Sequence, residues 1–295
     1  MSDSDDSLKK QHQLPQNFGE IIDSDDENWM PPKKSYSQLE EFEPSKFNKN
    51  IVALDWDFNK VFVKQLQIEA LEDPTWRAQV IKQFEIHPTL DHPNIVKVKE
   101  QNYEEKKIVL EFLNEANYFK KAILEQARPI TNMIKLRSYI QDIAEGLSYL
   151  HNLNYVHMDI RIETLHCTRG LEDLIRTVKL GDFGNIQRKG DILDAFHYEF
   201  IKKRQPMLPP ELAIGSQADP KMDIWCFGIV IHQMIMAYSP NLMPQNQNQP
   251  TKISFAKAHW NKYEVELFKL VKSMLQINAN DRPSAQQILQ IPWLQ

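Results

Sequence analysis

The chain has 295 residues, of which 42% are hydrophobic and 25% are charged, and its formal net charge is -5. This length and composition predict one large globular domain or two lobes with substantial cores, and the negative charge gives no reason to expect a nucleic-acid partner. No apolar run approaches the roughly 20 residues that cross a bilayer, and the acidic start MSDSDDSLKK is unlike a secretory signal or a basic transit peptide, so we expect no membrane partner.

The two cysteines, Cys167 and Cys226, both lie in segments that the sequence predicts to be buried. This pattern fits a reducing compartment and gives no reason to expect a disulfide or a thiolate metal site. We therefore expect an intracellular protein, cytoplasmic or cytoskeletal, with the nucleus also open.

Residues 1–36 differ in composition from the rest of the chain. Ser, Asp, Gln, Asn and Pro dominate there, and the cluster DSDD occurs at 3–6 and again at 23–26. Such a segment cannot bury enough apolar surface to offset the entropy that it would lose on ordering, so we interpret it as a tail. It is either a disordered solubilising leader or a docking peptide for a protein partner. A docking peptide would use the apolar residues Phe18, Ile21, Ile22, Trp29 and Met30.

Residues 37–113 predict a small sheet with one helix. NIVAL, the turn DFNK and VFVKQL carry β-branched and aromatic residues at two-residue spacing, which favours strands. A helix follows, with Asp73 as its N-cap, Pro74 at its first position and Pro88 closing it. One face of this helix carries Trp76, Val80 and Phe84. DHPNIVKV and KKIVLEFL then predict further strands.

Residues 114–295 predict a larger and mainly helical lobe. The segment IKLRSYIQDIAEGLSYLHNL has one apolar stripe, which we expect to be core: Leu136, Ile140, Ile143, Leu147 and Leu150. Short strands follow around 164–182, and helices around 222–237 and 262–290. The expected fold class is α+β, with a small N-terminal sheet lobe and a larger helical C-terminal lobe.

Several segments together resemble a eukaryotic protein kinase domain. VHMDIRIETL resembles the catalytic loop HRDLKxxN, LGDFGNI carries the DFG motif at 182–184, and LPPEL resembles APE. MDIWCFG and NDRPSAQQIL resemble the Asp-containing helix and the Arg-Pro stretch near the end of that domain. VFVKQL and FEIHPTLDHPNIVKV extend the match into the first lobe, so it covers about 38–294. The resemblance implies the bilobal kinase fold.

The residues that hold such a fold together are present. Glu211 and Arg282 match the pair that forms a buried ion bridge in the family, and Asp223 matches the helix residue that anchors the catalytic loop. The alternative is that these are surface charges. Buried charges are tolerated when they are paired, so we expect a well-folded large lobe.

The parts of the family that hold the nucleotide are altered. Kinases cover the ATP phosphates with a GxGxxG loop, since only glycine lets backbone amides approach so closely. Here no glycine lies between Gly19 and Gly146, and the register from Lys64 places SKFNKN at the loop. The glycine positions are then taken by Ser45, Phe47 and Asn50. A phosphate cradle is not expected.

The adenine slot is altered as well. The resemblance gives Glu111 and Leu113 the nucleotide-binding positions between the lobes, but Phe62 replaces the small alanine that roofs adenine. His166 replaces the aliphatic residue below the base. The Phe62 ring either fills the slot, where overpacking costs about 1–3 kcal/mol, or rotates aside into the core.

The charged groups that hold phosphate and metal are only partly retained. Lys64 matches the phosphate-binding lysine, but Gln83 stands where a helix glutamate pairs with it. Glu85 is about 200° away around the helix and does not substitute. Asp182 could hold one Mg²⁺, whereas Thr164 replaces the asparagine that is the second metal ligand, and a hydroxyl is a poorer donor for a hard cation.

The catalytic loop keeps one of the family's functional residues and replaces others. Asp159 occupies the position of the general base, and Arg161 replaces the lysine that steadies the transferring phosphate. The same aspartate also caps backbone amides, so we favour a vestigial base over a working one. Met158 replaces the arginine that receives an activation-loop phosphate. Residues 185–215 contain no Ser or Thr, and Tyr198 is their one phosphorylatable hydroxyl.

HMDI also resembles the Wee family of inhibitory kinases, although that family keeps a lysine and an asparagine where this chain has Arg161 and Thr164. Three functions follow. We favour a pseudokinase that binds or scaffolds protein partners without efficient phosphoryl transfer and without a cofactor. The alternatives are an active, atypical Wee-like kinase that uses ATP and Mg²⁺, and an architectural subunit of a large assembly.

Overall fold

The computed structural model describes residues 36–41, 48–66, 72, 74–170, 176–204, 207–243, 252–254, 260 and 263–295. The predicted docking residues of the tail lie outside this part of the chain, as do Ser45, Phe47 and Asp73 and the side chain of Trp76. Residues 36–295 form one compact unit. Within the described residues, no helix has both the length and the apolar character that a membrane crossing requires.

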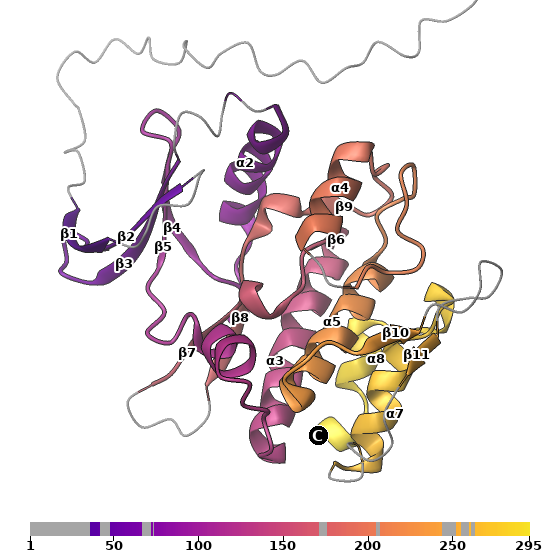
Figure 1. Cartoon of the computed structure of the whole chain (residues 1–295). Coiled ribbons are helices and arrows are strands. Elements are labelled where there is room, and N and C mark those ends of the chain that lie inside the picture. The colour runs from indigo at the N-terminus through magenta and orange to yellow at the C-terminus, as the bar shows by residue number, and fades with distance from the viewer. Residues whose placement is uncertain are drawn as a thin grey trace, which may run out of the picture. The chain divides into compact units, whose positions relative to one another are not determined.

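The N-terminal part of this unit is a five-stranded antiparallel sheet in the order β1-β2-β3-β5-β4 (Figure 1). Its strands are β1 (Ser37–Glu41), β2 (Asn48–Leu54), β3 (Lys60–Leu66), β4 (Val98–Asn102) and β5 (Lys107–Glu111). Alternation divides the side chains of β3 between two clusters. Val61 and Val63 pack with Ala53 and Val109, whereas Leu66 belongs to the cluster that also contains Phe84. The predicted small sheet is confirmed.

Helix α2 (Pro74–Ile86) begins at the proline that was expected at its first position. It ends before Pro88, which lies in the short 3-10 helix η1 (His87–Thr89). Val80 and Phe84 are buried on one face, as predicted.

The segment 91–98 differs from the strand that the sequence predicted, since β4 begins only at Val98. Ile95 forms an isolated bridge with Leu180, and the amide of Val96 donates to the Leu180 carbonyl at 2.9 Å. The backbone groups of Asn94 and Val96 therefore pair with Leu180 in the second half of the chain, whereas the Lys97 carbonyl accepts from the Glu111 amide of the sheet at 2.9 Å. The pairing with Leu180 connects the segment before β4 to a residue that lies two residues before Asp182 of the DFG motif.

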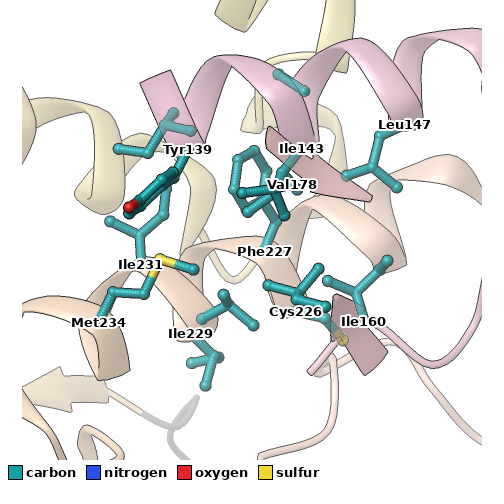
Figure 2. Close-up of a cluster of buried hydrophobic side chains, with 14 of the residues drawn as sticks. Tyr139, Ile143, Leu147, Ile160, Val178, Cys226, Phe227, Ile229, Ile231 and Met234 are labelled. Carbon is teal, nitrogen blue, oxygen red and sulfur yellow. The ribbon is translucent and has the colours of Figure 1, made fainter. Parts of the chain in front are cut away.

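Two long helices form the centre of the C-terminal part. Asn132 caps α3 (Met133–Asn152) by accepting from the amide of Lys135 at 3.0 Å, and Asp219 caps α5 (Pro220–Met236). The predicted stripe of α3 is confirmed as core, with each member 0% exposed: Leu136, Ile140, Ile143, Leu147 and Leu150. Figure 2 shows side chains of α3 and α5 gathered in this cluster with Val178.

The range 262–290 contains two helices, α7 (Val265–Met274) and α8 (Ala285–Leu289). The 3-10 helix η5 (Ala279–Asp281) lies between them, and η6 (Pro292–Leu294) follows. Helix α8 starts anew because Ser284 and Gln287 form a capping box, in which each side chain bonds the other residue's amide.

Short elements position the loops of the site. Strand β6 (Tyr155–Val156) pairs with β9 (Gln187–Arg188), and β7 (Leu165–Thr168) pairs with β8 (Thr177–Leu180). The helical turn η3 (Ile162–Thr164) lies within the predicted catalytic loop, and η4 (Phe183–Asn185) follows the DFG aspartate. The remaining elements are the π-helix η2 (Lys120–Glu125), α4 (Ala195–Arg204), β10 (Asn241–Met243) and β11 (Lys252–Ser254).

Candidate active site

A cavity of about 860 Å³ is lined by residues from both the sheet and the helical part. Most of the residues that the sequence assigned to a nucleotide site line it: Phe62, Lys64, Gln83, Glu111, Leu113, Arg161, His166 and Asp182. Asp159 and Thr164 are not in its wall and are fully buried. The fold thus brings the predicted positions together around one cavity.

Lys64 is paired with Asp182, whose carboxylate Oδ1 lies 2.8 Å from the lysine Nζ. Asp182 has a φ of 61°, in the left-handed region that Asp tolerates better than most residues. Gln83 lines the cavity, and its buried Nε2 has no hydrogen-bond partner within the described residues. Glu85 is exposed, so it does not take the place of the missing helix carboxylate.

The first strands show what replaces the glycine-rich loop. The sequence predicted 45–50 as the loop, but residues 48–50 belong to β2. They continue the antiparallel register with β3, in which Asn50 pairs with Lys64. The buried Oδ1 of Asn50 has no hydrogen-bond partner in the part of the chain that is described, and the residue lines the cavity.

Asp223 anchors the catalytic loop. Its carboxylate accepts from the amides of His157 at 2.8 Å and Met158 at 2.9 Å, and from the His151 ring at 3.0 Å. The His157 ring donates through Nε2 to the carbonyl of Gly181 at 3.0 Å, and burial lowers the pKa of this histidine. The loop is therefore held at both sides by buried hydrogen bonds.

Asp159 contacts Arg161 directly. The arginine Nε donates to the Asp159 Oδ1 at 3.0 Å, and the Nη1 lies 3.1 Å from Glu163 Oε2. Burial would lower the pKa of Arg161, but the carboxylates of Asp159, Glu163 and Asp182 outweigh it and raise that pKa. The negative charge of the would-be base is thus matched by a cation from its own loop.

Thr164 has its hydroxyl within the hydrogen bonds of the same loop. The Oγ1 lies 2.8 Å from the Asp159 carbonyl and 3.0 Å from the Arg161 carbonyl, and it accepts from the Arg161 amide at 3.2 Å. Thr164 is fully buried. The hydroxyl consequently closes the turn of η3.

The two residues that the sequence assigned to the adenine slot, Phe62 and His166, both line the cavity. Phe62 is half-buried and packs against the sheet cluster, while it also lines the cavity, so both placements that the sequence allowed are partly realised. His166 donates through Nδ1 to the Ala116 carbonyl at 3.2 Å, and burial lowers its pKa. A Cβ at Gly181 would lie 2.5 Å from the His166 Cδ2, so only glycine fits beneath this ring.

Glu111 and Leu113, which the sequence assigned to nucleotide binding between the lobes, also contact neighbouring residues. The Glu111 carboxylate lies 2.7 Å from the Lys179 Nζ and accepts from the Lys97 amide at 2.8 Å. Leu113 is buried in the sheet cluster. Among the described residues, no three His, Cys, Asp or Glu side chains are grouped as metal ligands.

His87 is a cavity residue that sequence reasoning missed. Its ring lies 4.4 Å from the ring of Phe183, which in turn lies 4.9 Å from His157. Burial lowers the pKa of His87 to about 4, and Nε2 donates to the Val96 carbonyl at 2.6 Å. Its spacing of four residues from Gln83 was the available signal, because residues at that spacing in a continuous helix share one face.

The segment after the DFG motif is fixed by packing. Met158 is buried in a cluster with Leu193, Ile201 and Leu212, and Tyr198 is half-buried against it. Glu211 and Arg282 form the predicted ion bridge, with two N–O distances of 2.6 and 2.8 Å. The buried guanidinium also donates to three carbonyl oxygens, those of Lys221, Gln276 and Ile277.

Comparison with known proteins agrees with this geometry. The family model described as protein kinase domain matches residues 51–294. The serine/threonine-protein kinase polo of Drosophila melanogaster is 26% identical over 278 residues, which are 89% of this chain and 44% of that protein. An Aurora kinase of Schizosaccharomyces pombe is 26% identical over 247 residues, which are 79% of this chain and 64% of that protein. The chain therefore spans less than two thirds of either relative. On these grounds, with its motifs placed around one cavity, the chain belongs to the protein kinase family.

Proposed function

We propose that this kinase domain is a pseudokinase, a module that binds or scaffolds protein partners without efficient phosphoryl transfer. The observation that carries the proposal concerns the two metal-ligand positions. Asp182 is paired with Lys64, and the Thr164 hydroxyl belongs to the hydrogen bonds of its own loop. Mg²⁺ needs several oxygen ligands in near-octahedral geometry, and of these two positions only Asp182 lines the cavity, with one of its carboxylate oxygens paired to Lys64.

The nucleotide part of the site supports the same proposal. Phe62 and His166 line the cavity where the family has small or aliphatic residues, and Asn50 adds a side chain where a glycine would let amides reach the phosphates. We propose that these residues do not fit magnesium-bound ATP as the family holds it. No cofactor is therefore part of the proposed function.

The ion pair with Arg161 supports a structural role for Asp159. A general base must accept a proton from a substrate hydroxyl, and the Asp159 Oδ1 already accepts a hydrogen bond from the Arg161 guanidinium at 3.0 Å. In the proposed function, both residues stabilise the loop that Asp223 anchors. The intracellular location expected from the sequence belongs to the same proposal, and both cysteines are free thiols.

An active, atypical kinase is the second candidate. Lys64, Asp159 and Asp182 are all in place, and a cavity of about 860 Å³ remains at the family's nucleotide position. The polo and Aurora relatives are kinases by name. The architectural-subunit alternative rests on the tail.

Thermal unfolding and phosphate transfer separate the first two candidates. We expect no change in melting temperature with millimolar ATP and Mg²⁺, because the altered cavity should not bind the nucleotide. We also expect no phosphate transfer to the chain itself or to generic substrates, because each lost contact costs about a hundred-fold or more in rate. Phe62→Ala should restore some nucleotide binding, since it reopens the slot, without creating transfer. Stabilisation of the unmodified chain by ATP, with turnover that Asp159→Asn abolishes, would establish the active kinase instead.

A further inference from the structure

The turn between β2 and β3 is rigid and is held by its own backbone and one side chain. The Asp55 Oδ1 accepts from the amides of Asp57 at 3.0 Å and Asn59 at 2.8 Å. The Asp55 amide donates to the Asn59 carbonyl at 2.9 Å, and the Phe58 amide donates to the Asp55 carbonyl at 3.0 Å. None of these bonds uses the side chain of Trp56 or Phe58, so the turn does not need either ring to keep its shape.

Phe58 occupies an unfavourable backbone conformation in this turn. Its φ is 62°, in the left-handed region where glycine and asparagine are preferred and a bulky side chain is strained. The chain would fold more easily with one of those residues at this position. Strain that persists at a surface position indicates a role for the side chain other than folding.

The two rings of the turn contribute little to the core. Trp56 is 68% exposed and Phe58 is 81% exposed, which makes Phe58 the most exposed large hydrophobic residue in the described part of the chain. Two exposed aromatic rings therefore lie within three residues of each other in the sequence of this turn. Aromatic residues dominate the binding energy of protein interfaces because they bury a large area at a small entropic cost.

The charge at the tip restricts what can bind there. The Asp55 carboxylate is engaged by the turn and lies 3.9 Å from Lys99, whereas Asp57 is exposed and, within the described residues, has no ion-pair partner. The tip is therefore apolar and acidic. An anionic membrane surface would repel Asp57, while a basic rim on a protein groove would attract it.

We propose that the Trp56–Phe58 tip is a docking site for a partner protein that has an apolar groove with Lys or Arg at its rim. This inference rests on the proposed function, because a binding module needs a surface that its fold does not require. Trp56 and Phe58 enter the groove, and Asp57 pairs with the rim.

The experiment places the photo-crosslinking residue p-benzoylphenylalanine at position 56 of the full chain, in cells that normally make it. The crosslinked protein is identified, and its affinity for the purified full chain is measured. We expect Trp56→Ser with Phe58→Asn to weaken binding by about thirty-fold or more. Asp57→Lys should weaken binding about ten-fold and change its salt dependence. The matched control is Ile134→Ser, since Ile134 is 69% exposed at the start of α3 and should leave binding unchanged.

A stability measurement keeps the result interpretable. Phe58→Asn should melt at the same temperature as the unmodified chain or higher, because it relieves the left-handed backbone at a residue without core contacts. Equal affinity of the double variant and the unmodified chain would overturn the docking site. So would crosslinking to lipid with binding to phosphatidylserine vesicles, crosslinking only to a second copy of the chain, or no crosslink at all. Phosphate transfer by the chain would instead contradict the proposed function and leave the docking result standing.

Discussion

His87 shows how one buried side chain makes stability depend on pH. Its ring is 1% exposed and packs against Phe183, and burial lowers its pKa from the ordinary 6.5 to about 4. The unfolded chain therefore binds a proton on this ring below pH 6.5, whereas the folded chain does so only near pH 4. The stability that the neutral ring contributes is fully present above pH 6.5 and is lost as the pH falls towards 4.

We predict that His87→Leu removes this part of the pH dependence. Between pH 7 and pH 5 the unmodified chain should lose about 2 kcal/mol of unfolding free energy that the variant keeps. His157 and His166 act with the same sign and Asp142, whose pKa is raised to about 6, acts against them, but all three remain in both chains. Urea unfolding at each pH measures the difference, and parallel curves would contradict the prediction.

At the scale of elements, the segment from η4 to α5 is held by a hydrophobic cluster and by one ion bridge. Met158 stands where the family has a phosphate-binding arginine, and it packs with residues on both sides of α4. Arg282 has a side chain that is 0% exposed, and Glu211 is its one carboxylate partner in the described residues. A charge that is buried this completely is stable only while it is paired.

We predict that Glu211→Ala lowers the free energy of unfolding by about 3 kcal/mol, because the buried guanidinium loses its counter-charge and keeps only carbonyl partners. Chemical denaturation measures the change. The control is Glu199→Ala, since Glu199 is 50% exposed and lies 3.5 Å from Lys202 in a surface pair that should contribute less than about 1 kcal/mol. Equal stability of the Glu211 variant and the unmodified chain would show that the bridge is not needed.

At the scale of the whole molecule, the domain and the tail have separate tasks in the proposed function. The Tyr36 hydroxyl donates to Glu100 at 2.6 Å, and Lys107 lies 4.8 Å from the centre of its ring. Tyr36 therefore belongs to the contacts of the sheet. The predicted docking residues Ile21, Ile22 and Trp29 lie in the part that precedes it.

We predict that deleting residues 15–35 weakens recruitment to a partner and leaves the melting temperature of the domain unchanged, because the contacts of Tyr36 with the sheet are kept. Co-purification with the full chain and with the shortened chain measures recruitment. A tail that acts as a passive leader would give equal recovery from both.

Local patterns were enough to predict much of this protein. The apolar stripe of α3 and the proline at the start of α2 are properties of neighbouring residues, and helix periodicity and capping depend on little else. The kinase motifs were recognised in the same way. Even the substitutions at Phe62, Gln83 and Thr164 could be read from register alone.

Only the tertiary structure decided what those residues contact. Lys64 and Asp182 are 118 residues apart, and their pairing depends on how the sheet meets the loop after β8. The Thr164 hydroxyl is hydrogen-bonded to the Asp159 carbonyl of its own loop, and the His87 ring packs against the Phe183 ring. The backbone groups of Asn94 and Val96 pair with Leu180, whereas the Lys97 carbonyl pairs with Glu111 of the sheet. Periodicity describes one element at a time, so it predicts which face of an element is buried, whereas the partner that covers the face is chosen by non-local packing and backbone hydrogen bonds.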